Sequence, residues 1–514
     1  MLFNTYGFVL LFLPVFIIGF CILRRTLFGK TSKELVLYLW IILGSLVFYG
    51  LFGLRNFLVL LFSLFWNGIT SYALSRADAG QKSSLYKKAV LFSGIFADVL
   101  LLLAFKFTGR VLPIAISFYT FNQISFIVDI YRGDVEGEDF DVIRYLGYIL
   151  FFPKLLQGPL MQYKKFETGM KRAFESRVDY EVVMRGLLLL SIGLFKKVIL
   201  ADTFGIAVNY GFSNIAVLGR MEAILSAFFY SFQLYFDFSG YCDVASAVCM
   251  LMGFELPVNF NSPYKAVNIM DFWKRWHITL TDFFTRYIYI PLGGSRKGEA
   301  RTYVNILIVF LISGIWHGTG WTFVVWGMMH GIMNVITRAV KTHCGAKVSA
   351  SASKDASATG AASASIRGGG ATTSRRGFGA AALHVAAVVG NFLYVTAAWV
   401  FFRAETVQDA IALFGRMIFG GVRPFYSTFA DGFRLNELWY FIKVTPIVNF
   451  SFAWDICLWL FLIFAVVVIF FCRNSLEYIK KCKIGVFTTI LTALLLIWCI
   501  VSFGGVATYL YMNF

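Results

Sequence analysis

Long apolar runs, separated by short basic clusters, recur from one end of the chain to the other and constrain its fold more than any other feature. A helix that crosses a lipid bilayer needs about 20 consecutive, largely apolar residues. Segments that approach this requirement lie at 7–23, 35–53, 56–74, 89–106, 111–130, 142–158, 184–207, 219–237, 242–254, 302–316, 320–337, 382–402, 453–472 and 484–511. Because several are short or polar, we predict an all-α, polytopic membrane protein with roughly eleven to thirteen spans and some re-entrant or interfacial helices.

The composition agrees with lipid as the main surroundings of the chain. Its residues are 59% hydrophobic and only 14% charged, whereas a soluble domain is about half apolar and roughly one-quarter charged. A net charge of +18 could indicate a nucleic-acid partner, but the cations form short clusters between apolar runs, as cytoplasmic loops do. These clusters include Arg24-Arg25, Lys87-Lys88, Lys164-Lys165 and Lys480-Lys481. We therefore expect membrane lipids, and no nucleic acid, as partners.

The runs also predict how the chain is organised. Residues 1–340 form a transmembrane core, and residues 381–514 add C-terminal helices that complete it. Residues 345–380 are rich in Ala, Ser and Gly and cannot bury enough apolar surface to offset the entropy of ordering, so we predict a disordered, cytoplasmic loop there. The basic stretch from Arg24 to Lys33 is also expected in the cytoplasm, which leaves the N-terminus outside.

Polar and ionisable side chains inside a membrane are costly and are therefore functional candidates, and here they gather between residues 230 and 335. A first group runs from Gln233 to Asp243 and includes Asp237 and Tyr241. Two interpretations remain open for it. The group either forms a hydrogen-bonded network that locks helices together or contacts a substrate.

A second group, Asp271 to Thr281, is too charged to span lipid, so we expect it at the interface or along a cavity. If it is helical, Trp273 and His277 share a face because they are four residues apart. Arg275 lies between them, and further cations follow at Arg286, Arg296, Lys297 and Arg301. These later cations either meet the phosphates of a nucleotide-bearing acyl donor such as coenzyme A or simply anchor a cytoplasmic loop.

A third group surrounds His317, which follows a strongly apolar run and is flanked by Trp316 and Gly318. The chain has 5 histidines, and His277, His317 and His330 all fall in this one stretch. A buried histidine can be an ordinary core residue. A neutral imidazole in a dry cavity can also take a proton from an alcohol, which typically accelerates a reaction by roughly a hundred- to ten-thousand-fold.

Other chemistries fit the sequence poorly. It contains no GxSxG, HExxH or Walker motif and no GxGxxG between a strand and a helix. His277 and His317 come without a clustered set of Cys or carboxylate ligands, so we predict no metal site.

Ordered sequence blocks carry a resemblance to a known family. They are Leu112–Gln123, Val128–Gly133, Phe151–Pro159, Tyr235–Tyr241, Asn259–Tyr264, Asp271–His277, Tyr289–Gly294 and Trp316–Gly318. Each block alone is weak, but together and in this order they resemble the membrane-bound O-acyltransferases, and within them the branch that includes the membrane subunit of alginate O-acetyltransferase.

The resemblance implies an activity and a set of partners. Members of this family move an acyl group from a cytoplasmic thioester to a hydroxyl acceptor, often across the membrane, through a central funnel. For this chain it implies acetyl-CoA as donor substrate, no permanently bound cofactor, and an extracytoplasmic polysaccharide as acceptor, such as an alginate-like exopolysaccharide, cellulose or peptidoglycan. It further implies a periplasmic SGNH-type acetyltransferase partner and a place in the bacterial cytoplasmic (inner) membrane.

The resemblance also assigns residues. The histidine of the Trp-His-Gly block, His317, matches the essential residue of the family, and His277 matches a second position that is often Asn or His. We expect these two to be catalytic. We expect the substrate to be contacted by Trp273, Arg275, Trp316, Asp237 and Tyr241.

A transporter or flippase for a lipid-linked sugar is the alternative, because many helices and a deep polar cluster suit it equally well. Transporters are often built from internal repeats, and this sequence contains none that we can identify. The ordered blocks therefore favour the enzyme.

Overall fold

The computed structural model describes residues 1–80, 82–108, 111–135, 140–176, 179–358, 373–450, 453–503 and 509–510. Within these ranges the chain forms helices and no strand, which confirms the predicted all-α class. The elements are η1 (Gly7–Phe12), α1 (Leu13–Thr26), α2 (Lys33–Gly50), α3 (Leu54–Ala79), α4 (Ser84–Phe107), α5 (Ile116–Tyr131), α6 (Val142–Leu150), α7 (Phe152–Leu155), α8 (Tyr163–Glu175), α9 (Tyr180–Leu194), η2 (Phe195–Ala201), α10 (Asp202–Ser213), η3 (Ile215–Val217), α11 (Arg220–Met252), η4 (Pro263–Lys265), α12 (Ile269–Trp273), α13 (Ile278–Phe284), η5 (Thr285–Tyr289), α14 (Glu299–His317), α15 (Trp321–Ala358), α16 (Thr373–Arg403), α17 (Val407–Phe419), α18 (Ser427–Asp431), α19 (Asn436–Lys443), η6 (Pro446–Asn449), α20 (Ala453–Phe470), α21 (Ser475–Lys481) and α22 (Val486–Val501).

Seven of the described helices are long and apolar enough to cross a membrane, or eight if the pair Asp455–Phe470 and Ser475–Lys481, bent by 69°, counts as one broken span. They are α2, α4, α14 and the continuous η1–α1, together with parts of α3, α15 and α16. The chain is therefore a multi-pass membrane protein. The number of such helices is lower than the roughly eleven to thirteen spans predicted from the apolar runs.

The difference arises because several apolar runs are buried in protein, not in lipid. The run at 142–158 breaks into the short helices α6 and α7, and Pro153 lies in the first turn of α7, where its missing N–H is tolerated. The runs predicted as two spans at 219–237 and 242–254 are one helix, α11, of 33 residues. Their separation into two spans is therefore wrong.

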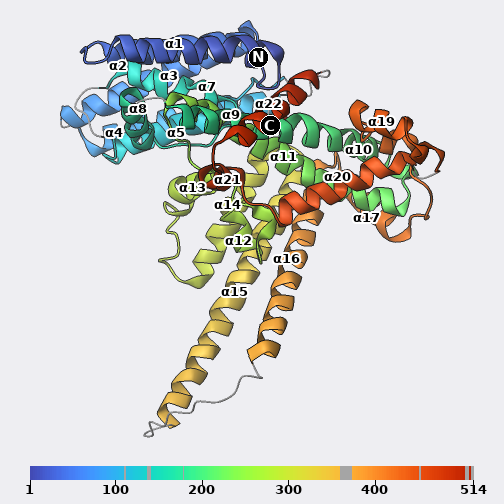
Figure 1. The fold of residues 1–514 in the computed structure, drawn as a ribbon. Coiled ribbons are helices and arrows are strands. Elements are labelled where there is room, and N and C mark those ends of the chain that lie inside the picture. Colours follow the sequence, from blue (N-terminus) through green and yellow to red (C-terminus); the bar gives the residue numbers. More distant parts are fainter. Residues whose placement is uncertain are drawn as a thin grey trace, which may run out of the picture.

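Helix α11 lies at the centre of the molecule, where α9, η2, α10, α16 and α17 all pack against it (Figure 1). The glycine of this helix, Gly240, allows close packing and does not bend the helix. A Cβ at Gly240 would lie 2.8 Å from the carbonyl oxygen of Gly193 on α9, and a Cβ at Gly193 would lie 2.9 Å from that of Gly240. Small residues on both helices thus let the two backbones approach closely, as is common inside membranes.

Helices α15 and α16 run side by side and project together beyond the rest of the molecule (Figure 1). They reach into the segment predicted as a loop, since α15 ends at Ala358 and α16 begins at Thr373. The remaining residues of that predicted loop, 359–372, lie outside the described residues. The predicted disorder stays a prediction.

The close approach of α9 and α11 can be tested with Gly240→Ala. The added methyl group meets backbone atoms that cannot move alone, so we expect the thermal unfolding temperature in detergent to fall by several degrees. Gly415→Ala on α17 is the matched control, because nothing lies within 4 Å of its Cβ position. Alanine favours a helix over glycine by about 0.5–1 kcal/mol, so this variant should be neutral or slightly stabilised. Equal unfolding temperatures for both variants would contradict the packing argument.

Candidate active site

His317 is the last residue of α14 and lines a cavity of about 950 Å³. The helix ends there because Gly318 adopts an extended backbone, with φ −172° and ψ 167°. Glycines also bring α14 and α15 together: a Cβ at Gly314 would lie 2.5 Å from the carbonyl oxygen of Phe323. His317 therefore stands at the end of two tightly packed helices, a position that holds a side chain more rigidly than a long loop does.

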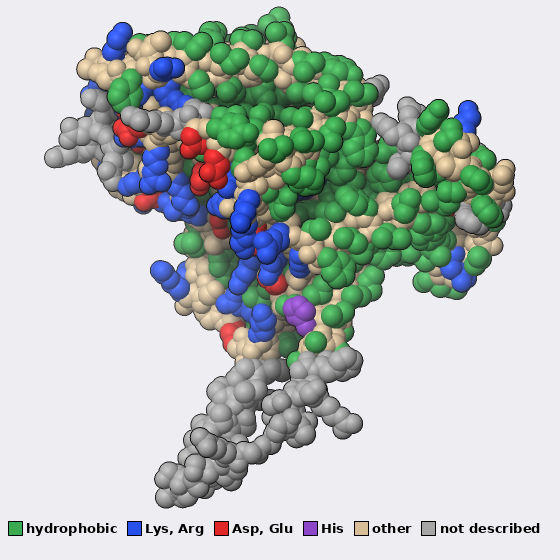
Figure 2. Space-filling model, in the orientation of Figure 1, with side chains coloured by type: hydrophobic (Ala, Val, Ile, Leu, Met, Phe, Trp, Pro, Cys, Tyr) green, Lys and Arg blue, Asp and Glu red, His purple; other side chains and the backbone are tan. Residues whose placement is uncertain are grey.

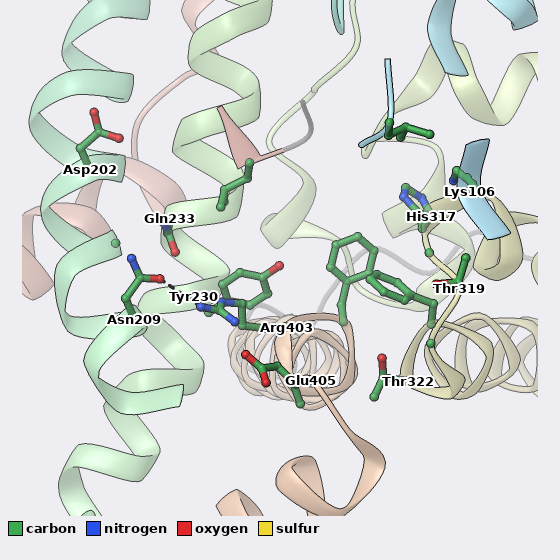
Figure 3. Close-up of a pocket in the computed structure, with 18 of the residues that line it drawn as sticks. Lys106, Asp202, Asn209, Tyr230, Gln233, His317, Thr319, Thr322, Arg403 and Glu405 are labelled. Carbon is green, nitrogen blue, oxygen red and sulfur yellow. Dashed lines mark hydrogen bonds between the residues drawn. The ribbon is translucent and has the colours of Figure 1, made fainter. Parts of the chain in front are cut away.

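The cavity is lined by polar and charged side chains from several helices, as Figure 3 shows. Its polar lining consists of Lys106, Lys197, Asp202, Asn209, Tyr230, Gln233, Thr319, Thr322, Arg403 and Glu405. Arg403 donates a hydrogen bond to Asn209, with 3.0 Å between Nη2 and Oδ1. Such a volume is within the range of small-molecule sites, and hydrogen-bonding groups around it suit a polar ligand.

The His317 ring is enclosed by aromatic side chains and is only 2% exposed. Its centroid lies 4.5 Å from the ring of Trp316, 5.0 Å from Trp326 and 5.1 Å from Phe402. Trp316 in turn stacks on Phe121 at 5.1 Å. Walls of this kind hold the imidazole in one orientation and keep bulk water away from it, which strengthens its electrostatic interactions.

His277 is also buried, but it does not lie on a helix. It sits between α12 and α13 with a left-handed backbone, φ 45° and ψ 50°, so the prediction that it shares a helical face with Trp273 is wrong. A left-handed conformation costs a non-glycine residue about 1–3 kcal/mol and persists only where the surroundings enforce it. Here Nδ1 of His277 lies 3.2 Å from Oδ1 of Asn259, and its ring meets Phe238 edge-on at 4.8 Å.

His330 belongs to the same aromatic cluster but not to the lining of the cavity. Its ring lies 5.1 Å from Trp326 and 5.2 Å from Trp273. Neither ring nitrogen has a hydrogen-bond partner among the described residues. His330 therefore packs as a core side chain. His277 is not in the lining of the cavity either, so His317 is the one of these three histidines that meets the cavity directly.

Of the residues expected to contact substrate, Trp316 flanks His317 as described, and Trp273 lines a second cavity. That cavity has a volume of about 220 Å³ and is also lined by Phe310, Ser313 and Arg338. Arg275 lies on the outside of this region, where its Nε forms a part-exposed ion pair with Asp271 at 2.9 Å. The structure thus brings Trp316 to His317, and it places Trp273 and Arg275 elsewhere.

Asp237 and Tyr241 form hydrogen bonds within the protein. Oδ1 of Asp237 accepts from Nζ of Lys197 at 2.7 Å, and its Oδ2 accepts from the backbone N–H of Leu510 at 2.9 Å. The hydroxyl of Tyr241 donates to the carbonyl oxygen of Pro153 at 3.4 Å. Neither residue lines the His317 cavity, whereas Lys197 does. This arrangement favours the network interpretation for Asp237 and Tyr241, with Lys197 at the edge of the network. Gln233, from the same polar group, lines the cavity.

Lys197 and Lys106 are cavity residues that the sequence reasoning missed. Each lies in an apolar run, 184–207 or 89–106, so the rule that charges inside a membrane are functional candidates would have found both. Nζ of Lys106 lies 5.7 Å from the ring centroid of Trp316. Arg403 and Glu405 gave no comparable signal, because only the fold brings them to the cavity from a distant part of the chain.

Among the cations proposed either to meet phosphates or to anchor a loop, Arg286 is held by acids. Its Nη2 lies 2.7 Å from Oδ2 of Asp134 and 3.4 Å from Oδ1 of Asp129. These contacts favour an anchoring role for Arg286. In the described part of the chain, no three His, Cys, Asp or Glu side chains lie close enough together to hold a metal ion.

Removing the cation of the Lys197 cluster should destabilise the protein strongly. Lys197 Nζ lies 2.7 Å from Asp237 and 2.8 Å from Asp202, so Lys197→Met leaves two carboxylates without it. Removing one partner of a buried ion pair costs about 3–5 kcal/mol. We expect a loss of this size in the free energy of unfolding, measured in detergent. Lys481→Met is the control, since its ion pair with Glu477 is exposed and such pairs contribute about 0–1 kcal/mol. Similar losses for both variants would argue against the buried pair.

Burial lowers the pKa of His277 to about 3 from its ordinary value of 6.5. The unfolded chain therefore takes up a proton on this residue as the pH falls through about 6.5, whereas the folded protein does not until about 3. Stability should accordingly fall as the pH decreases from 7 toward 4. His277→Asn removes the titrating group, so its unfolding temperature should depend less on pH over this range. Identical slopes for the two proteins would show that His277 does not stay neutral.

Comparisons with known proteins agree with this geometry. A sequence model of the membrane-bound O-acyltransferase family matches residues 41–347. A peptidoglycan O-acetyltransferase of Helicobacter pylori is 34% identical, over 81% of this chain and 80% of its own length. A probable alginate O-acetylase of Pseudomonas fluorescens is 32% identical, over 81% and 75%. A teichoic acid D-alanyltransferase of Lacticaseibacillus rhamnosus is 29% identical, over 53% and 71%. With its multi-pass helical fold, the chain belongs to the membrane-bound O-acyltransferase family and is an O-acyltransferase.

Proposed function

We propose that this chain transfers an acetyl group from cytoplasmic acetyl-CoA to a hydroxyl on an extracytoplasmic polysaccharide, with His317 as the general base. One observation carries the proposal: in an O-acyltransferase, a buried histidine at the end of α14 lines a large polar cavity. Acetyl is favoured over D-alanyl because the peptidoglycan O-acetyltransferase and the Pseudomonas fluorescens alginate O-acetylase named above each match 81% of the chain, and the Lacticaseibacillus D-alanyltransferase matches 53%.

In this proposal, the two sides of the membrane are assigned from the direction of α14 to α16. Helix α14 ends at His317 and α15 leaves from Trp321, so the cavity lies at the end of this bundle opposite the projecting α15–α16 ends (Figure 1). Lys and Arg side chains gather on the face shown in Figure 2, over the region where α8 and α21 lie in Figure 1. Both helices carry basic clusters predicted to be cytoplasmic. In this assignment the projecting ends of α15 and α16 lie in the cytoplasm, and the His317 cavity faces the extracytoplasmic side.

The smaller cavity beside Trp273 is our candidate for the donor side. It is lined by Ser313, which lies four residues before His317 on α14 and so shares its helical face. Arg338 and Ser295, joined by a 3.3 Å hydrogen bond, also line it. An apolar slot with a cation at its rim suits a thioester arm whose far end carries phosphates. Arg296, Lys297 and Arg301 remain candidates for those phosphates.

In the proposed step, a neutral imidazole at His317 accepts the proton of the acceptor hydroxyl as its oxygen attacks the thioester carbonyl carbon. A C–O bond forms, the C–S bond breaks, and the proton passes to the departing thiolate. His277 supports this step by orienting the hydroxyl. Proton transfer by a positioned base typically contributes roughly a hundred- to ten-thousand-fold in rate.

The polar lining of the His317 cavity suits a sugar as the acceptor. Asn209, Gln233, Arg403 and Glu405 offer both donors and acceptors to a sugar. The relatives named for peptidoglycan and alginate make a cell-envelope polysaccharide the proposed final acceptor. The attacking hydroxyl belongs either to the sugar or to a serine of a periplasmic SGNH-type partner that passes the acetyl group on. Polymer acetylation in a strain without the partner distinguishes the two routes.

The proposal is tested by His317→Ala in proteoliposomes supplied with radiolabelled acetyl-CoA. We expect label transfer to fall by about a hundred-fold or more, with normal expression and insertion. His384→Ala is the control, because His384 is exposed on α16 and should keep full activity.

Wild-type transfer by the His317→Ala variant would exclude His317 as the base. Sugar flux without any label transfer by the unmodified protein would instead favour the transporter alternative.

A further inference from the structure

Two stretches of polar sequence that are separate in the chain meet at His277. The backbone N–H of Asn261 donates to the carbonyl oxygen of Arg275 at 2.9 Å, and that of Ile278 donates to the carbonyl oxygen of Asn259 at 3.0 Å. The segment around Asn259 therefore runs beside His277 and is bonded to it on both sides. This pairing brings the Asn259 side chain, which is 2% exposed, against the imidazole.

Three groups approach the side-chain oxygen of Asn259. Oδ1 lies 3.2 Å from the backbone nitrogen of Thr279, 3.0 Å from the Thr279 hydroxyl and 3.2 Å from Nδ1 of His277. A backbone N–H can only donate, so an acceptor must face it, and this contact selects Oδ1 over the amide nitrogen. The amide nitrogen points the other way, toward Sγ of Cys242 at 3.6 Å.

The Thr279 hydroxyl is oriented in the same way. Its oxygen accepts a hydrogen bond from the backbone N–H of Leu160 at 2.9 Å, which is again a donor only. The hydroxyl proton is thereby directed to Oδ1 of Asn259. A chain of donors thus runs from Leu160 through Thr279 to Asn259, and each link has only one possible direction.

We propose that Asn259 is a positioning residue that holds His277 in the tautomer with its proton on Nδ1 and its lone pair on Nε2. Oδ1 of Asn259 can only accept, so a neutral His277 must donate from Nδ1. Burial keeps the ring neutral, since it lowers the pKa of His277 to about 3. The inference rests on the proposed function, because it assigns His277 the role of accepting a hydrogen bond from the substrate hydroxyl.

The tautomer decides what His277 can do for the reaction. With its lone pair on Nε2, the ring can accept a hydrogen bond from the incoming hydroxyl and orient it for His317. With the opposite tautomer, Nε2 would carry the proton and donate it to the hydroxyl oxygen, so the hydroxyl proton would not be held by His277. In another enzyme class, loss of the group that sets a histidine tautomer costs about ten-thousand-fold in kcat. Because His277 is a supporting residue here, we expect a smaller effect.

A first experiment reads the tautomer directly in the intact, unsubstituted protein. Solid-state NMR of ¹⁵N-histidine-labelled protein in lipid bilayers reports which ring nitrogen carries the proton, and the His277→Asn spectrum assigns the His277 signals. We expect a protonated Nδ1 and an unprotonated Nε2. A proton on Nε2 would overturn the proposal, whatever the activity of any variant.

A second experiment measures kcat and KM for acetyl transfer in Asn259→Leu and Asn259→Asp. Leucine removes the acceptor, so we expect kcat to fall by about ten- to a hundred-fold with little change in KM. Aspartate keeps the acceptor and adds a charge that raises the pKa of His277. We therefore expect it to restore most of the activity and to move the acid limb of the pH–rate profile to higher pH.

Asn261→Ala is the matched control. Asn261 is exposed in the same segment, and its recorded hydrogen bonds use only backbone atoms, so activity should not change. Equal losses in the leucine and aspartate variants, or full activity in the leucine variant, would contradict the positioning role. Failure of the proposed function is separate, since it would appear as full activity in His317→Ala.

Discussion

Two neighbouring lysines and the two aspartates they meet on α11 set the arrangement on which the rest of the site depends. Lys196 Nζ lies 2.6 Å from Asp243, and Lys197 Nζ lies 2.7 Å from Asp237. Charges in a medium of low dielectric constant must be paired or they cost several kcal/mol each. The pairs therefore allow one register between η2 and α11, and the nearby glycine contact lets the two backbones come close enough for the lysines to reach.

The pairing of buried charges also connects the protein interior with the His317 cavity, through Lys197. Lys197 is paired to Asp237 inside the protein, yet it lines the space that His317 meets. On the opposite side, His317 is enclosed by Trp316, Trp326 and Phe402. The site thus combines a charged wall, which can hydrogen-bond a polar ligand, with an aromatic wall that holds the imidazole in one orientation. Both walls are built from helices, so their geometry depends on helix packing throughout the core.

Hydropathy was enough to predict the helical class and the membrane. The high cost of polar groups in lipid indicated only the stretch between residues 230 and 335 as a candidate site, and the family resemblance then selected His317 within it. What could not be predicted depends on contacts between distant residues. Helix α11 runs unbroken through Gly240, which faces Gly193 on α9, and Arg403 lines the cavity, where it donates a hydrogen bond to Asn209. The left-handed backbone at His277 was not predicted either, because no local sequence pattern indicates it.

The left-handed backbone at His277 limits which residue types can occupy this position. Apart from glycine, Asn, Asp and His are the residues found most often with φ above zero. The family resemblance implies Asn or His at this position, and both belong to that short list. Asn differs from His in shape and in acid–base behaviour, but it can occupy the same backbone at little extra strain. The backbone conformation thus limits which residue types can occupy position 277 at little strain, whatever their chemistry.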